Sequence, residues 1–169
     1  VRSIAEQLSD IEAVDSAYLF MLAVGMGRNH RLLKAGEYEF QKKTNPRTIL
    51  RILTSGKTLV HKLTVPEGLT RSEVLDLIEN TTALSGEVKT VPTEGSLLPE
   101  TYHFSRGENR NALIARMETS MQATLQDLWG KRRAGLPYSS PSEALVMASI
   151  IEKETGLERE RARVAAVFV

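Results

Sequence analysis

The sequence predicts an α+β fold in which most of the chain is helical. Six segments carry apolar residues at helical three- and four-residue spacing, whereas only two short segments alternate apolar and polar residues as strands do. With 41% hydrophobic and 25% charged residues, the composition is that of an ordinary globular protein. A length of 169 residues allows one domain or two small ones.

The first part of the chain should combine helices with short strands. Helical periodicity over residues 1–27, interrupted near its middle, predicts two helices. A turn glycine followed by alternation predicts a short strand at residues 37–40. Asn45 precedes a helix that ends at the Ser-Gly pair at 55–56, and the alternation at residues 59–65 predicts a second strand.

A capping box and a polar connection follow. Thr70, with Glu73 three residues later, matches the reciprocal capping box that begins a helix. Residues 81–92 are polar and contain Gly and Pro, so we expect the internal boundary there. Residues 94–104 combine a glycine, a proline, carboxylates and aromatics, which is typical of neither an ordinary helix nor an ordinary strand.

The last third should be mainly helical. Residues 109–129 form a long amphipathic pattern. Ser140 as cap, Pro141 at the first helical position and Glu143 at the third predict a final helix that reaches the EKET sequence at 152–155.

Charge and residue types exclude several functions. The chain has 22 Lys and Arg against 21 Asp and Glu, a net charge of +1, and lacks the basic excess of nucleic-acid binders. It has no cysteine, hence no thiolate chemistry. His30, His61 and His103 do not form a helical metal-binding pair, so we expect neither a metal nor another cofactor.

The final helix carries the best candidate for acid–base chemistry. At about 100° per residue, Glu154 falls near the middle of the apolar face, whereas Glu152 falls on the polar half. A carboxyl group among apolar side chains has a raised pKa, as a general acid requires. The apolar face comprises Val146, Met147, Ile150 and Ile151, and Ser149 and Lys153 accompany Glu152. Alternatively, Glu154 is solvated beyond the packed part of the helix.

Four motifs resemble those of the YceG-like family of endolytic murein transglycosylases. They are LKAGEY at 33–38, VPEGLT at 65–70, EGSLLPETY at 94–102 and ASIIEKET at 148–155. The resemblance spans essentially the whole chain, and the last two motifs are the most specific.

The resemblance implies an enzyme of the bacterial cell wall, anchored in the inner membrane with its catalytic part in the periplasm. Such enzymes cleave the β-1,4 bond between N-acetylmuramic acid and N-acetylglucosamine in peptidoglycan strands without water and leave a 1,6-anhydro end. The implied organisation is a small LysM-like α/β portion at 1–80, a linker at 81–92, and the first part of a helix-rich catalytic domain at 93–169. Possible partners are the peptidoglycan synthases.

The same resemblance assigns roles to five residues. Glu154 is the implied catalytic acid and base, because lytic transglycosylases place Ser or Thr directly after the acid, here Thr155. Glu100 is a candidate for orienting substrate or stabilising positive charge, and Tyr102 for a wall of the site. Glu94 and Thr155 complete the predicted substrate-binding set. For Glu94 and Glu100, stabilisation of turns and loops is an equally good interpretation.

Two interpretations without catalysis remain open: a peptidoglycan-binding module, and a scaffold that recruits cell-wall synthases. The chain begins on Val1 without a methionine and has no apolar run of about 18 residues. We therefore expect a piece of a longer protein that holds the catalytic glutamate and part of the cleft, with any membrane anchor outside it.

Overall fold

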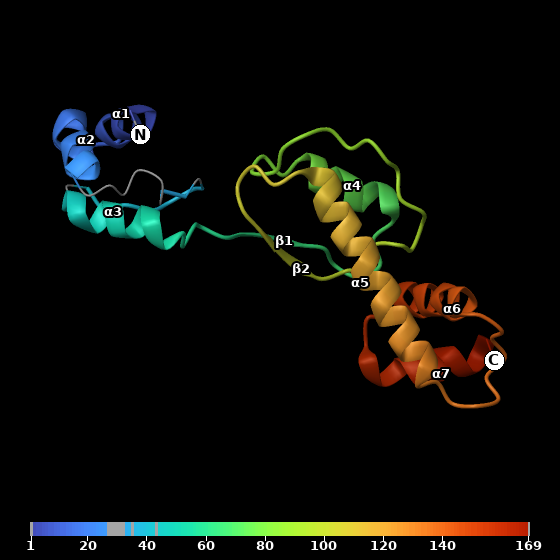
Figure 1. Ribbon diagram of the computed structural model, residues 1–169. Coiled ribbons are helices and arrows are strands. Elements are labelled where there is room, and N and C mark those ends of the chain that lie inside the picture. Colours follow the sequence, from blue (N-terminus) through green and yellow to red (C-terminus); the bar gives the residue numbers. More distant parts are fainter. Residues whose placement is uncertain (1, 27–32, 35, 43, 169) are drawn as a thin grey trace. The chain divides into compact units, whose positions relative to one another are not determined.

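The computed structural model describes residues 2–26, 33–34, 36–42 and 44–168, and it is a helix-rich α+β fold (Figure 1). The chain divides into two units, residues 1–61 and 62–169. The helices are α1 (Arg2–Asp10), α2 (Ala17–Met26), α3 (Pro46–Ser55), α4 (Arg71–Glu79), α5 (Arg110–Gly130), α6 (Pro141–Glu154) and α7 (Glu158–Phe168). Strands β1 (His61–Thr64) and β2 (Thr101–Phe104) form a two-stranded sheet. Among the described residues, every helix is too short or too polar to cross a bilayer.

In the first unit, α1, α2 and α3 enclose a core centred on Phe20, Val24 and Ile49. The two predicted N-terminal helices are confirmed, and α3 begins as expected, because the Asn45 side chain accepts a hydrogen bond from a backbone N–H of the first turn. The strand predicted at residues 37–40 is absent. That segment is irregular, and its aromatic side chains pack against the core instead.

In the second unit, α4, α5 and the sheet surround one core. Leu113 and Met117 of α5 are fully buried, as is Ile78 of α4. The capping box at α4 is confirmed, with Thr70 and Glu73 exchanging hydrogen bonds. Strand β2, which the sequence did not indicate, directs Tyr102 and Phe104 into this core.

The connection at residues 81–92 is part of the second unit rather than a linker. Ala83 and Leu84 are buried in its core, and Ser85 forms a bridge with Asn109 at the start of α5. The Arg110 guanidinium donates hydrogen bonds to four backbone carbonyls between residues 78 and 86. The structural boundary therefore falls near residue 61, not at 81–92, because residues 62–80 bury their apolar side chains in this core. The LysM-like character of the first part stays a prediction.

Of the two C-terminal helices, α6 packs on α5, and α7 packs on α6. Helix α6 contacts α5 and α7, yet no side chain of α6 or α7 is fully buried (Figure 1). Helix α6 begins as predicted, with Ser140 as its N-cap. Helix α7 was not predicted, although its first residues, ERER at 158–161, are strong helix formers.

Candidate active site

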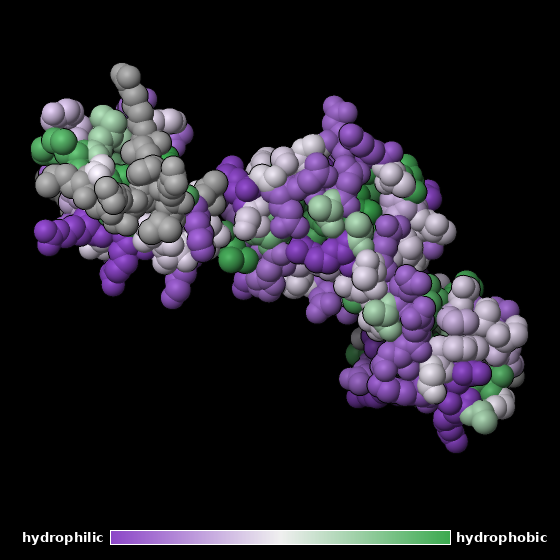
Figure 2. All heavy atoms as spheres, viewed as in Figure 1, coloured by the Kyte–Doolittle hydropathy of each residue, from purple (hydrophilic) through white to green (hydrophobic). Residues whose placement is uncertain are grey.

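A cleft of about 510 Å³ in the second unit is bordered by three segments that are distant in sequence. They are the turn at residues 65–70, residues 94–99, and one face of α6. Met121 of α5 also lines the cleft. These segments carry the VPEGLT, EGSLLPETY and ASIIEKET motifs. The fold thus brings three of the four motifs to one concave surface. Across this unit, hydrophobic and hydrophilic residues are interspersed on the visible face (Figure 2).

The turn side of the cleft is fixed by local hydrogen bonds. Gly68 has φ 77°, a conformation that favours glycine, and the turn leads directly into the Thr70 cap. The Thr70 backbone N–H donates to the Glu73 carboxylate over 2.7 Å. Hydrogen bonds from Thr70 therefore lower the pKa of Glu73. The Glu94 carboxylate accepts a 2.9 Å hydrogen bond from the Arg71 backbone N–H, which joins the second cleft segment to the start of α4.

The face of α6 that borders the cleft is largely not the apolar face that the sequence predicted; of that face, Val146 alone lines the cleft. Leu145, Ala148, Ser149 and Glu152 line it, whereas Glu154 does not. Glu154 is exposed, so the apolar environment predicted for it is wrong and the alternative of a solvated Glu154 fits, because it is the last residue of α6 and the chain leaves the helical conformation at Thr155. Met147, Ile150 and Ile151 of the predicted apolar face are half-buried, whereas Ala148 and Ser149 at the cleft are exposed.

The two carboxylates at the end of α6 have different surroundings. Glu152 is 28% exposed, and its carboxylate accepts a 2.9 Å hydrogen bond from the Arg161 guanidinium of α7. Glu154 is exposed and, among the described residues, has no hydrogen-bond or ion-pair partner. It follows Lys153, the last cleft-lining residue of α6. The carboxylate that Arg161 engages therefore borders the cleft, whereas Glu154, one residue beyond the cleft-lining part of α6, does not.

Thr155 connects α6 to α7. It is 8% exposed, and its hydroxyl donates a 3.1 Å hydrogen bond to the Glu160 carboxylate. The same oxygen accepts a hydrogen bond from the Leu157 backbone N–H. The residue predicted to bind substrate thus has its hydroxyl engaged in the corner between the helices, directly after Glu154.

The structure separates the remaining predicted site residues. Glu94 lines the cleft, whereas Glu100 is exposed at the start of β2, outside it. Tyr102 is 6% exposed, and its hydroxyl donates to the Leu98 carbonyl over 2.7 Å. Burial raises the pKa of Tyr102. The structure therefore places Tyr102 in the core, and not on a wall of the cleft, because the alternation of β2 directs it inward.

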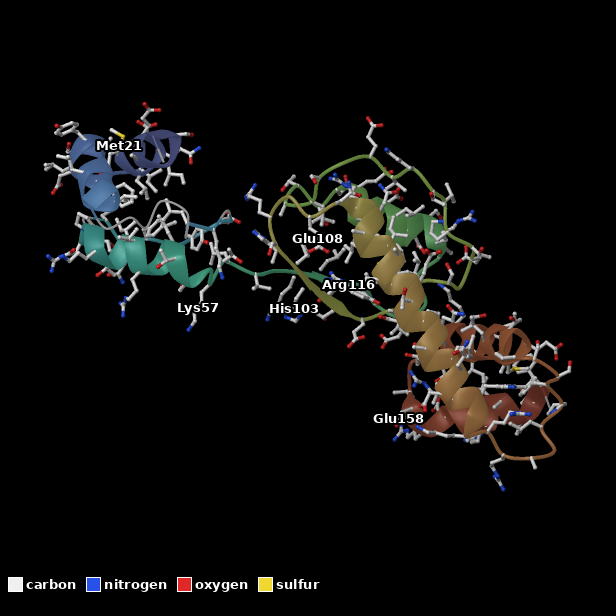
Figure 3. The ribbon with its side chains drawn as sticks, viewed as in Figure 1. Met21, Lys57, His103, Glu108, Arg116 and Glu158 are labelled. Atoms are coloured by element: carbon white, nitrogen blue, oxygen red, sulfur yellow. The ribbon has the colours of Figure 1, made fainter. Side chains whose placement is uncertain are left out.

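Three charged residues at the cleft were missed as site residues: Glu67 in the turn, and Glu152 and Lys153, which helical periodicity placed on a solvated face. Their positions inside the VPEGLT and ASIIEKET motifs were the available signal. His103 is exposed on β2, and its carbonyl accepts a hydrogen bond from Arg116 of α5 (Figure 3). His30 lies outside the described residues. Within the described part of the chain, no three acidic or histidine side chains are grouped as metal ligands would be.

Comparison with known families agrees with the motif pattern. The profile of the YceG-like family matches residues 1–169. The chain belongs to the YceG-like family. Two curated relatives, both described as endolytic murein transglycosylase and both from Streptococcus pneumoniae (strains D39 and R6), are 25% identical to it over 183 aligned positions. The alignment covers 83% of this chain but 33% of each relative, so the chain spans about a third of their length.

Another YceG-like protein has a solved structure. A crystal structure of a yceG-like protein from Listeria monocytogenes is 22% identical, with a TM-score of 0.43. The alignment covers 95% of the present chain and 62% of the chain of the Listeria protein.

Proposed function

We propose that the chain is part of an endolytic murein transglycosylase, a carbon–oxygen lyase, whose catalytic residue is Glu154. The observation that carries the proposal is the meeting of three family-like motifs at one cleft, with Glu154 directly after its last lining residue on α6. Membership of the YceG-like family and the names of its relatives support the same reaction class.

The proposed reaction needs a single carboxyl group. Glu154, protonated, donates its proton to the glycosidic oxygen as the bond from the muramic anomeric carbon to that oxygen breaks. The Glu154 carboxylate then accepts the proton of the muramic C6 hydroxyl, whose oxygen bonds to the anomeric carbon. The products are a free 4-hydroxyl on N-acetylglucosamine and a 1,6-anhydro muramic end, and the carboxyl group is regenerated. Ordinary glycosidases instead use a second carboxylate.

Glu154 is a better candidate for the acid than Glu152 because its carboxyl group is free. The Glu152 carboxylate is held by the Arg161 guanidinium over 2.9 Å, so it is not free to approach a glycosidic oxygen. This argument replaces the one from the apolar helix face. It agrees with the position of Thr155 directly after the acid.

The cleft supports recognition of glycan strands. It combines apolar side chains with carboxylates and one amine. Sugars bind such a surface through hydrogen bonds to the polar groups and through contacts of their apolar ring faces with the apolar side chains. The cationic Lys153 is placed to meet an anionic substituent of the strand. We propose that the protein acts on the peptidoglycan of the cell wall from the periplasmic side of an inner-membrane anchor, with peptidoglycan synthases as partners.

The first unit, residues 1–61, is proposed as the peptidoglycan-binding portion, with its boundary moved from residue 80 to the one that the structure gives. Its contribution is affinity for the strand rather than bond cleavage.

A product analysis tests the proposal. Intact natural protein is incubated with purified peptidoglycan, and the soluble products are separated and weighed by mass spectrometry. The proposal expects muropeptides with 1,6-anhydro ends from wild type and none from Glu154→Gln, which retains glycan binding in a pull-down. Reducing ends in place of anhydro ends, or undiminished release by Glu154→Gln, would contradict it. The exposed Glu158 offers the control variant Glu158→Gln, which should behave as wild type.

A further inference from the structure

The corner between α6 and α7 is tied by two side-chain links on either side of Glu154. Thr155, the residue after Glu154, donates its hydroxyl proton to the Glu160 carboxylate over 3.1 Å. Glu152, two residues before it, accepts from the Arg161 guanidinium over 2.9 Å. Glu160 and Arg161 are consecutive residues of α7.

We infer that Glu160 and Arg161 are positioning residues, which fix the end of α6, and with it Glu154, through Thr155 and Glu152. The inference rests on the proposed function. Neither residue lines the cleft, so both act through α6 and not on the substrate.

The need for such a device follows from the weak packing of α6. No side chain of α6 is fully buried, and Glu154 is its last residue, where helices tend to fray. The α6 C-cap, Thr155, leaves the helical conformation with φ −149° and ψ 129°. Hydrophobic contacts alone therefore do not hold the end of α6. The hydrogen bonds from α7 replace them.

The Thr155 hydroxyl makes two hydrogen bonds in this arrangement. It donates to Glu160 and accepts from the Leu157 N–H, so one oxygen fixes both the end of α6 and the entry to α7. Because Thr155 is buried, these bonds are shielded from competing water. The Glu152–Arg161 pair is more exposed, and we expect it to matter less.

The test separates positioning from folding by comparing kcat with KM in the intact natural protein on purified peptidoglycan. Thr155→Val and Glu160→Ala should each lower kcat by about 10- to 100-fold, the loss typical of a misplaced catalytic group, with KM within about twofold of wild type. Thr155→Ser and Glu160→Gln keep the hydrogen-bonding oxygens and should recover most of the rate. The double variant Thr155→Val/Glu160→Ala should be no slower than Thr155→Val alone, because that substitution already removes the bond to Glu160.

Controls distinguish the possible failures. Glu158→Ala removes a carboxylate from the same helix, and its kcat should be unchanged; circular dichroism checks that every variant is folded. Wild-type kcat in folded Glu160→Ala and Thr155→Val, together with an inactive Glu154→Gln, would overturn the positioning role alone. Full activity of Glu154→Gln would overturn the proposed function itself. Equal losses in Glu160→Gln and Glu160→Ala would also contradict positioning through an accepted hydrogen bond.

The second link is tested in the same assay. Arg161→Met should reduce kcat by severalfold, with a smaller effect than Glu160→Ala, whereas Arg163→Met on the exposed side of α7 should have none. An Arg161→Met rate equal to that of wild type would remove Arg161 from the assignment and leave Glu160.

Discussion

Arg110 should contribute more to the stability of the second unit than any other exposed or half-buried arginine. Its guanidinium donates two half-buried hydrogen bonds, to the Ile78 carbonyl over 3.2 Å and to the Thr81 carbonyl over 3.1 Å. It donates two further hydrogen bonds, which are exposed, to the carbonyls of Glu79 and Gly86. Exposed carbonyls regain water when the guanidinium is removed, so the two half-buried bonds dominate. At about 1.5 kcal/mol for each bond to a charged donor, Arg110→Met should cost about 3 kcal/mol.

Urea unfolding followed by the fluorescence of Trp129 measures this loss. Trp129 is the single tryptophan and belongs to the same unit, so its signal reports that unit. Arg110→Lys should lose nearly as much as Arg110→Met, because an ammonium group cannot reproduce the planar fork. Arg133→Met, beyond the end of α5, is the matched control and should change stability by less than about 0.5 kcal/mol. A loss for Arg110→Met no larger than the control's would refute the view that residues 81–92 are clamped into the fold.

Three further changes have outcomes that follow from single contacts. Because burial raises the pKa of Tyr102 in the folded state, the stability that the neutral Tyr102 side chain contributes is lost as pH rises above about 10. Above that pH, the melting temperature of wild type should fall more steeply than that of Tyr102→Phe. Hydrogen bonds from Thr70 lower the pKa of Glu73, so the stability that wild type has over Glu73→Ala at pH 7 should disappear as pH falls through that lowered pKa, as measured by urea unfolding at each pH. Gly95 has φ 75°, and an added Cβ would lie 3.2 Å from Leu145 Cδ2, so thermal unfolding should show Gly95→Ala to be destabilised by about 1–2 kcal/mol.

Local signals in the sequence predicted the ends of helices well. The caps at Asn45, Thr70 and Ser140 all form as expected, because a cap depends on residues two or three positions away and those are visible in the sequence. The same reasoning explains why α5, with its long periodic pattern and Asn109 cap, was predicted almost to the residue.

Signals that depend on distant partners failed. Strand β2 was missed and a strand at 37–40 was wrongly expected, because pairing depends on a neighbour that the local pattern does not show. The cleft was not predictable from periodicity, because its three segments are distant in sequence and meet only in the folded unit. The family motifs had nevertheless singled out the same three segments. The roles of Glu154, Glu100 and Glu94 rest on the family resemblance and stay predictions.

The most direct test of the central claim compares the rates at which Glu154→Gln and Glu152→Gln release anhydro-muropeptides from purified peptidoglycan in the intact natural protein. If Glu154 is the acid and base, Glu154→Gln should lose at least about 10²-fold in rate, the scale of general acid–base catalysis. Glu152→Gln, which only weakens a pair with Arg161, should retain a measurable fraction of the wild-type rate. The reverse order, with Glu152→Gln inactive and Glu154→Gln active, would contradict the account and move the catalytic role to the carboxylate inside the cleft.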